Sequence, residues 1–113
     1  MTLYIDTTDS LKTIIRINDI QFVQKYSSPR EQNILLFIDS VLKENNANLN
    51  DIASIEVNPG PGSFTGTRVG VAIANTLAQS LNIPINGEKP PINVNYQIPP
   101  NITKPKIAQV VIK

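Results

Sequence analysis

The segment from residue 58 to residue 70, NPGPGSFTGTRVG, constrains the fold of this chain more than any other stretch. It holds four of the five glycines, and Pro59 and Pro61 alternate with the first two of them. Proline fixes φ, whereas glycine permits backbone conformations that other residues avoid. The segment therefore predicts a stiff loop that opens a helix over residues 65–81.

A phosphate-binding loop is the first functional interpretation of such a segment, because backbone N–H groups at a helix N-terminus attract anions. The spacing, however, does not match the two common phosphate motifs. A Walker loop needs Lys and then Ser or Thr after its last glycine, but Thr67 and Arg68 follow here, and a dinucleotide fingerprint needs glycine at position 65. We therefore expect a structural strand-to-helix loop shaped by Gly60, Gly62, Ser63, Thr65, Gly66 and Arg68.

The later glycines fall at helical spacing. At about 100° per residue, a shallow stripe of small residues runs down the predicted helix beside a bulky stripe. Small residues at every fourth position let another backbone approach closely. We interpret the stripe as a packing surface, within the domain or against another chain, in preference to a ligand site. The small stripe comprises Gly66, Gly70, Ala74 and Ala78, and the bulky stripe comprises Val69, Ile73, Leu77 and Leu81.

The remaining pattern predicts an α/β fold. Turn signals at Asp9-Ser10 and Asn18-Asp19 separate three apolar runs, which indicate an antiparallel meander. A short last strand is expected to run parallel to the strand before the helix, because the helix would be its crossover. The sheet is therefore predicted to be mixed and five-stranded, with strands over residues 2–6, 12–17, 20–26, 54–58 and 84–86 and a helical turn over 49–53.

A further helix is predicted over residues 29–44. Ser28 is a candidate N-cap, Pro29 suits the first helical position, and Glu31 completes a capping box. A helix that lies on one sheet needs an apolar arc of only about 100°, yet residues 34–38 are five consecutive apolar side chains. Some of these side chains need a second surface, which is either a cover of loops and C-terminal residues or a protein interface.

The composition excludes several kinds of site. The chain contains no His and no Cys, which rules out disulfides, Ser–His and Cys–His nucleophile pairs and most zinc sites. Residues 1–89 carry seven basic and nine acidic side chains, and residues 90–113 add three scattered lysines, so independent nucleic-acid binding is disfavoured. No apolar run reaches the ~20 residues of a membrane span, and no signal peptide is recognised at the N-terminus. We therefore expect a cytoplasmic protein without a membrane partner.

A second candidate site follows the first predicted strand. Asp6, Thr7 and Thr8 place a carboxylate and two hydroxyls in one turn, where they could hold a phosphate or a metal-bound water. The same residue types form hydrogen-bonded turns that need no ligand. The turn is the favoured interpretation, a degenerate phosphate site is the alternative, and no metal or cofactor is expected.

Beyond Gly87 the composition changes. Five of the nine prolines lie between residues 90 and 105, in a stretch without glycine. Residues 88–113 therefore predict an extended, Pro-rich tail. Its last residues, 107–113, are expected to form an added strand or an arm that contacts a neighbour. The predicted organisation is one domain over residues 1–87, followed by this tail.

Taken together, several segments resemble the TsaB family, also called YeaZ. The segments are Ile5-Asp6-Thr7, Ser28-Pro29-Arg30-Glu31, LNDIASI at 49–55, and above all GPGSFTG at 60–66 with Arg68 and Gly70. The resemblance implies a single N-terminal lobe with the RNase H-like fold of the actin/Hsp70 (ASKHA) class. It also implies a subunit of the machinery that makes threonylcarbamoyladenosine at position 37 of tRNA.

In that family the TsaB subunit is not the catalyst. The resemblance implies that it pairs with a TsaD-like paralogue, which holds the metal and transfers the threonylcarbamoyl group, and that a TsaE-like ATPase joins them. It also implies pairing through the two predicted helices, so this chain is expected to be a scaffold rather than an enzyme. The expected interface residues are Ile34, Leu35, Phe37, Ile38, Val41, Val69, Gly70, Ile73, Ala74 and Leu77.

The chain also departs from the family pattern. Family members are usually far longer and carry a second lobe, and Gln32 stands where many relatives have His. An intact nucleotide pocket, which in this class lies between two lobes, is therefore not expected. Two alternatives stay open. One is a homodimeric or heteromeric interaction module outside tRNA modification, and the other is a nucleotide-dependent hydrolase that uses Asp6 and the glycine loop.

Overall fold

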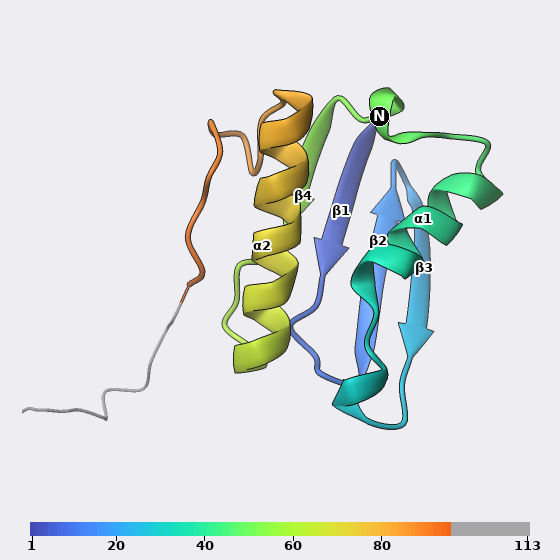
Figure 1. Ribbon diagram of the computed structural model, residues 1–113, viewed down its shortest axis with the longest axis vertical. Coiled ribbons are helices and arrows are strands. Elements are labelled where there is room, and N and C mark those ends of the chain that lie inside the picture. Colours follow the sequence, from blue (N-terminus) through green and yellow to red (C-terminus); the bar gives the residue numbers. More distant parts are fainter. Residues whose placement is uncertain (96–113) are drawn as a thin grey trace, which may run out of the picture.

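The computed structural model describes residues 1–95, which form a four-stranded mixed sheet with two α-helices on one of its faces (Figure 1). The strand order is β3-β2-β1-β4, in which β1 to β3 are antiparallel neighbours and β4 lies parallel to β1. The predicted meander is therefore confirmed. The elements are β1 (Thr2–Asp6), β2 (Lys12–Ile17), β3 (Ile20–Lys25), a 3₁₀ turn (Pro29–Glu31), α1 (Ile34–Glu44), a second 3₁₀ turn (Leu49–Asp51), β4 (Ser54–Val57) and α2 (Phe64–Leu81).

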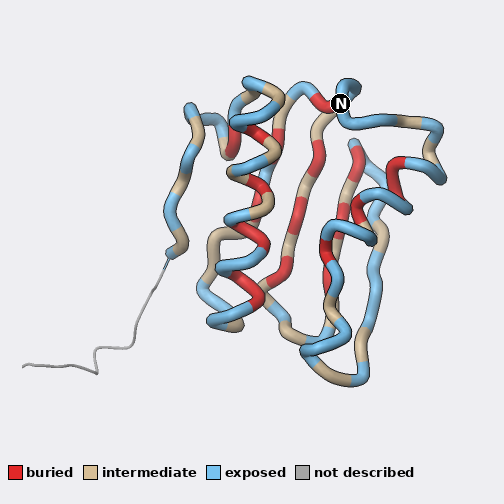
Figure 2. Tube along the Cα trace, viewed as in Figure 1, coloured by how far each residue is buried: buried red, intermediate tan, exposed pale blue. Residues whose placement is uncertain are grey.

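Buried residues alternate with exposed or partly exposed ones along β1, β2 and β4, so the apolar side chains of one face of the sheet point toward the helices. Leu3 and Ile5 of β1 are fully buried, whereas Tyr4 between them is partly exposed. Because successive strand side chains point to opposite faces, Tyr4 and its cross-strand neighbours Arg16 and Glu56 lie on the far face of the sheet. Figure 2 shows the buried residues on the strands and on the helix sides turned toward them. The core of the sheet comprises Leu3, Ile5, Ile15, Ile17, Ile55 and Val57.

Helix α1 begins later than the sequence predicts. Its N-cap is Asn33, whose side chain accepts a 3.2 Å hydrogen bond from a backbone N–H of the first turn. The turn Pro29–Glu31 is a separate 3₁₀ element in which the Ser28 side chain makes no capping bond. The predicted capping box is therefore wrong. The predicted helix over residues 29–44 is also interrupted, because the backbone becomes extended at Gln32 and stops that turn from continuing into α1.

Helix α2 follows the glycine loop as predicted. The Ser63 side chain caps it by accepting a 3.3 Å hydrogen bond from the N–H of Gly66. The helix ends at Asn82, which takes the left-handed conformation with φ +56°. Asparagine tolerates this conformation better than most residues, so it stops a helix where glycine is absent.

The predicted fifth strand is wrong as a strand, although its direction is right. Ile85 forms one parallel bridge with Ile55 of β4. The Asn86 side chain then replaces the backbone, because its Nδ2 donates to the Val57 carbonyl at 3.0 Å and its Oδ1 accepts from the Val57 N–H at 2.8 Å. Positive φ angles at Asn86 and Gly87 turn the chain away at this point. Among the residues that the structure describes, the sheet therefore has four strands rather than five.

The described residues that follow α2 run back beside this helix (Figure 1). Residues 92–95 are held there by hydrogen bonds to α2 and to the glycine loop, so this part of the predicted tail packs on the domain. The strand or arm predicted over 107–113 lies outside the described residues. Within residues 1–95, no helix has the length and apolar character needed to cross a bilayer.

Candidate functional site: a docking surface on two helices

The start of α2 packs directly on the turn that follows β1. A Cβ atom added at Gly62 would lie 2.5 Å from the Cβ of Thr8. One added at Gly66 would lie 2.6 Å from the Thr7 carbonyl oxygen, and one at Gly70 would overlap the Thr7 hydroxyl. Gly62, Gly66 and Gly70 therefore leave no room for a larger residue, because the backbone or the side chain of Thr7 or Thr8 occupies the space that its Cβ atom would need. The packing role of the glycines is internal to the domain.

The Asp6 carboxylate is engaged within its own turn. Its Oδ1 accepts from the N–H of Thr8 at 2.9 Å and from the Thr8 hydroxyl at 2.7 Å. Its Oδ2 accepts from the Asn58 amide at 3.2 Å and from the Tyr4 hydroxyl at 3.3 Å. Partial burial opposes ionisation, but the hydrogen bonds from Thr8, Asn58 and Tyr4 outweigh it and lower the pKa of Asp6. The carboxylate therefore serves as the anchor of a hydrogen-bonded turn.

The first glycine of the loop is required by its backbone conformation. Gly60 has φ +105°, a region that side-chain-bearing residues rarely adopt. Its N–H donates to the side-chain oxygen of Asn58 at 3.1 Å.

Nearby, Thr67 is buried and its hydroxyl has no hydrogen-bond partner among the described residues. Within residues 1–95, no group of three His, Cys, Asp or Glu side chains comes together as a metal site would require.

Gln32 connects the β sheet to the start of α1. Its amide nitrogen donates to the hydroxyl of buried Thr13 on β2 at 3.1 Å. The Tyr26 hydroxyl donates to the same oxygen at 3.0 Å. Gln32 therefore has a structural partner inside the domain, and its side chain fixes the entry into α1.

The predicted interface residues divide into a buried and an exposed set. Leu35 on α1 is 57% exposed and Val69 on α2 is 43% exposed. Phe37, Ile73 and Leu77 are partly exposed. The others are buried and can support a surface but expose little of their side chains to a partner; they are Ile34, Ile38, Val41, Gly70 and Ala74.

A shallow apolar groove runs between α1 and α2. Its central part has a volume of about 220 Å³, and an adjoining hollow of about 280 Å³ lies toward the 3₁₀ turn before α1. Leu35 and Ile73 line both, so the two hollows form one continuous feature that we call the helix groove. The remaining lining residues are Pro29, Gln32, Asn33, Ile34, Thr65, Val69, Ala72, Thr76 and Leu77.

Two further residues of α1 and α2 were not among the predicted interface residues, and neither of them lines the helix groove. Leu36 is 64% exposed and lies beside Leu35 on α1. Asn75, within α2, exchanges two hydrogen bonds with the backbone of Ile92. A signal was present for Asn75, because asparagine in a helix interior has low helix propensity and therefore suggests a specific partner.

The family model described as TsaD, tRNA N6-adenosine threonylcarbamoyltransferase, matches residues 24–89. The TsaB protein of Bacillus subtilis is 34% identical over 88 residues, which cover 74% of this chain and 38% of that protein. The TsaB protein of Escherichia coli is 41% identical over 61 residues, or 52% of this chain and 26% of that protein. The chain thus spans well under half the length of the curated relatives that it matches.

Solved structures of YeaZ and of a protein similar to it share the fold of this chain. A Pseudomonas aeruginosa protein described as similar to the peptidase YeaZ superposes with a TM-score of 0.62 and 25% identity. The superposition covers 74% of this chain and 40% of that one. YeaZ from Pseudomonas aeruginosa itself shares the fold with a TM-score of 0.62. Because a TsaB protein is 34% identical over 74% of this chain and the solved structures that share its fold are YeaZ or are described as similar to it, the chain belongs to the TsaB/YeaZ family and matches it over a part consistent with one lobe.

Proposed function

We propose that this chain is a non-catalytic docking subunit in the biosynthesis of threonylcarbamoyladenosine in tRNA. It binds a TsaD-like partner through the helix groove between α1 and α2, and a TsaE-like ATPase joins the pair in the cytoplasm. The TsaB relatives, whose names describe biosynthesis of this nucleoside, support the pathway. The match to a TsaD family model supports a partner of related fold.

The observation that carries the proposal is the exposure of large apolar side chains on two adjacent helices. Leu35, Leu36 and Val69 all remain exposed although their helices are packed on the sheet. The two helices bury one side each, and Leu35 and Val69 line the groove that separates them. A contiguous apolar groove of this kind is typical of a protein interface.

The chemistry of the β1 turn supports a role without catalysis. The Asp6 carboxylate accepts four hydrogen bonds from its own domain, so a metal or phosphate ligand would have to displace them. The glycine loop is filled by Thr7 and Thr8 where a phosphate would approach a glycine-rich cradle. Both features favour a structural loop over the hydrolase alternative.

Binding to the TsaD-like protein of the same source tests the partner. We expect Val69→Asp to weaken the complex by roughly tenfold or more, because it would place a charge at an apolar position that the partner would cover in the complex. Val23→Asp is the matched control: Val23 is 45% exposed, against 43% for Val69, but it lies on β3 and pairs with Ile14 on the far face of the sheet. Equal binding by both variants, measured by isothermal titration calorimetry on folded proteins, would contradict the groove as the interface.

The pathway is tested separately in the source cell. Depletion of this chain should lower the threonylcarbamoyladenosine content of tRNA, measured by mass spectrometry of nucleosides, and the Val69→Asp chain should restore it less well than the Val23→Asp chain. An unchanged nucleoside content after depletion would instead favour an interaction module outside tRNA modification.

A further inference from the structure

Residues 92–95, which we call the strap, are held on α2 by the Asn75 side-chain amide, which pairs with the backbone of Ile92 as a neighbouring strand would. The Nδ2 of Asn75 donates to the Ile92 carbonyl at 2.9 Å, and the Ile92 N–H donates to the Oδ1 of Asn75 at 2.9 Å. At its other end, the Asn95 N–H donates to the Pro59 carbonyl at 2.7 Å. The strap is therefore fixed at both ends, once to the middle of α2 and once to the glycine loop.

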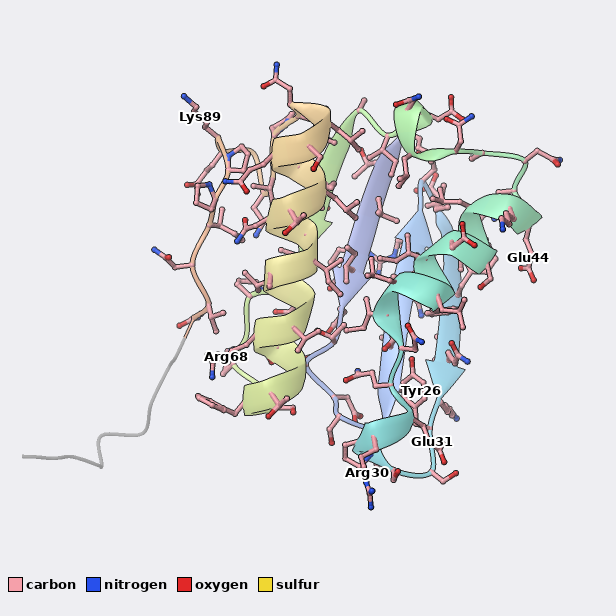
Figure 3. All side chains as sticks on the ribbon, viewed as in Figure 1. Tyr26, Arg30, Glu31, Glu44, Arg68 and Lys89 are labelled. Carbon is pink, nitrogen blue, oxygen red and sulfur yellow. The ribbon has the colours of Figure 1, made fainter. Side chains whose placement is uncertain are left out.

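A hollow of about 730 Å³ lies between the strap and α2, on the side of α2 away from α1. Val69 and Ala72 contribute to it from α2, and Ile92 and Val94 contribute from the strap. Arg68 is the charged residue in its lining, and Figure 3 shows Arg68 beside the first turns of α2, on the strap side. The hollow is thus mostly apolar, with one cation at its edge.

This hollow and the helix groove share residues. Ala72 lines the hollow and the central part of the groove, and Val69 lines the hollow and the part of the groove near the 3₁₀ turn. The two residues therefore form a ridge on α2, with a depression on either side of it. A partner that contacts the exposed side chain of Val69 meets both depressions.

We propose that the strap is the second wall of the docking surface, so that the TsaD-like partner straddles the α2 ridge and inserts an apolar segment with a carboxylate into the hollow, facing Arg68. This inference rests on the proposed function for the identity of the partner. The strap, through Asn75, then determines how far the docking surface extends beyond the two helices.

Charge favours a different protein over a second copy of this chain. Neither the hollow nor the helix groove has an acidic residue in its lining. In a two-fold symmetric dimer the same patch would face itself, which would bring two Arg68 cations into one interface without a carboxylate to pair them. Among residues 1–95, Arg68 contacts the ring of Phe64 at 4.8 Å and forms no salt bridge. An acidic residue on another protein would complete its pairing.

Site-specific photo-cross-linking of the full chain tests which molecule occupies the hollow. The photoreactive residue p-benzoylphenylalanine replaces Val94 of the strap in one variant and Leu35 of the helix groove in another. We expect both variants to cross-link to the TsaD-like protein. Cross-links from position 35 alone would overturn the strap inference and leave the proposed function standing, whereas cross-links from neither position would contradict the proposed function itself.

Two further outcomes of the same experiment identify other occupants. A cross-link from position 94 to a second copy, or within the same chain, in the presence of saturating partner would overturn the inference. Circular dichroism and the melting temperature of each variant establish that it is folded before irradiation.

Charge reversal tests the role of Arg68. Arg68→Glu should weaken partner binding by roughly tenfold, and Arg68→Lys should retain more affinity because it keeps the charge. Lys25→Glu on β3 is the matched control, since it makes the same charge change at an exposed position away from the helices. Equal affinity of Arg68→Glu and Lys25→Glu, at low and high salt, would overturn the proposed carboxylate contact.

Discussion

The hydroxyl of Thr7 donates a 2.6 Å hydrogen bond to the carbonyl oxygen of Gly66, which joins the turn after β1 to the first turns of α2. The same threonine side chain fills the space where Gly70 would carry a Cβ atom. Thr7 is fully buried. One small polar residue therefore sets how closely α2 approaches the sheet, and with it the position of the docking surface on the outer side of α2.

Gly70→Ala should destabilise the domain, although alanine is the better helix former. The intrinsic gain of about 1 kcal/mol is outweighed by overpacking against Thr7, which costs about 1–3 kcal/mol. Chemical denaturation gives the free energy of unfolding. In the double variant with Thr7→Ala, the added methyl group should cost less than in the wild-type background, because the Thr7 hydroxyl that overlaps it is gone. If Gly70→Ala lowers the free energy of unfolding equally in the two backgrounds, Thr7 does not determine how closely α2 approaches the sheet.

Thr7→Val should lower the free energy of unfolding by about 1–2 kcal/mol, because it keeps the shape of the side chain and removes a buried hydrogen bond. Thr76→Val provides the control. Thr76 also donates to a helix carbonyl, that of Ala72 at 2.9 Å, but it is exposed, so water can replace its bond. A loss of stability in Thr76→Val as large as that in Thr7→Val would contradict the importance of burial.

Asp6 should make the domain sensitive to acid. Its pKa is lowered in the fold, so the stabilisation it provides is present above the unfolded value of about 3.9 and is lost as the pH falls through the folded pKa. Asp6→Asn should therefore reduce stability at pH 7 and flatten the fall in stability below about pH 4. Urea denaturation across this range measures both effects.

Thr8→Val tests one hydrogen bond of the Asp6 carboxylate by the same measurement of stability against pH. It keeps the Asp6 carboxylate but removes the hydroxyl that donates to it at 2.7 Å. The acid transition should then move to higher pH than in the wild type, because the ionised carboxylate has lost one donor. A transition that stays in place, or moves to lower pH, would show that this hydrogen bond does not hold the pKa down.

Asn75→Asp should release the strap. A carboxylate oxygen replaces the Nδ2 donor and repels the Ile92 carbonyl, so the backbone N–H of Ile92 should exchange its hydrogen faster in a hydrogen–deuterium exchange experiment. Asn93→Asp is the control, because it makes the same chemical change at an exposed neighbour. Unchanged protection of Ile92 in Asn75→Asp would mean that the amide pair does not fasten the strap.

Local patterns predicted the elements well wherever the signal was itself local. Apolar runs and turn dipeptides placed the meander, and the glycine loop with Ser63 placed the start of α2. The same kind of reasoning failed at Ser28 and Glu31, where the cap belongs to a short 3₁₀ turn and Asn33 caps α1 instead. Two competing caps lie five residues apart in the sequence, and only the packing of α1 on the sheet selects between them. The RNase H-like assignment in its detail, the domain boundary at residue 87 and the interface itself stay predictions.

By itself, the sequence predicted that Gly66 and Gly70 serve close packing and that Gly62 shapes the loop rather than a standard phosphate motif, because spacing along a chain and along a helix is a local property. Only the tertiary structure decided what they pack against. Thr7 and Thr8 lie more than fifty residues earlier in the chain, and their contact depends on the parallel pairing of β1 with β4. The tertiary structure also decided which apolar residues of α1 and α2 are core and which remain exposed, because burial depends on where the sheet ends and no helical period encodes that boundary.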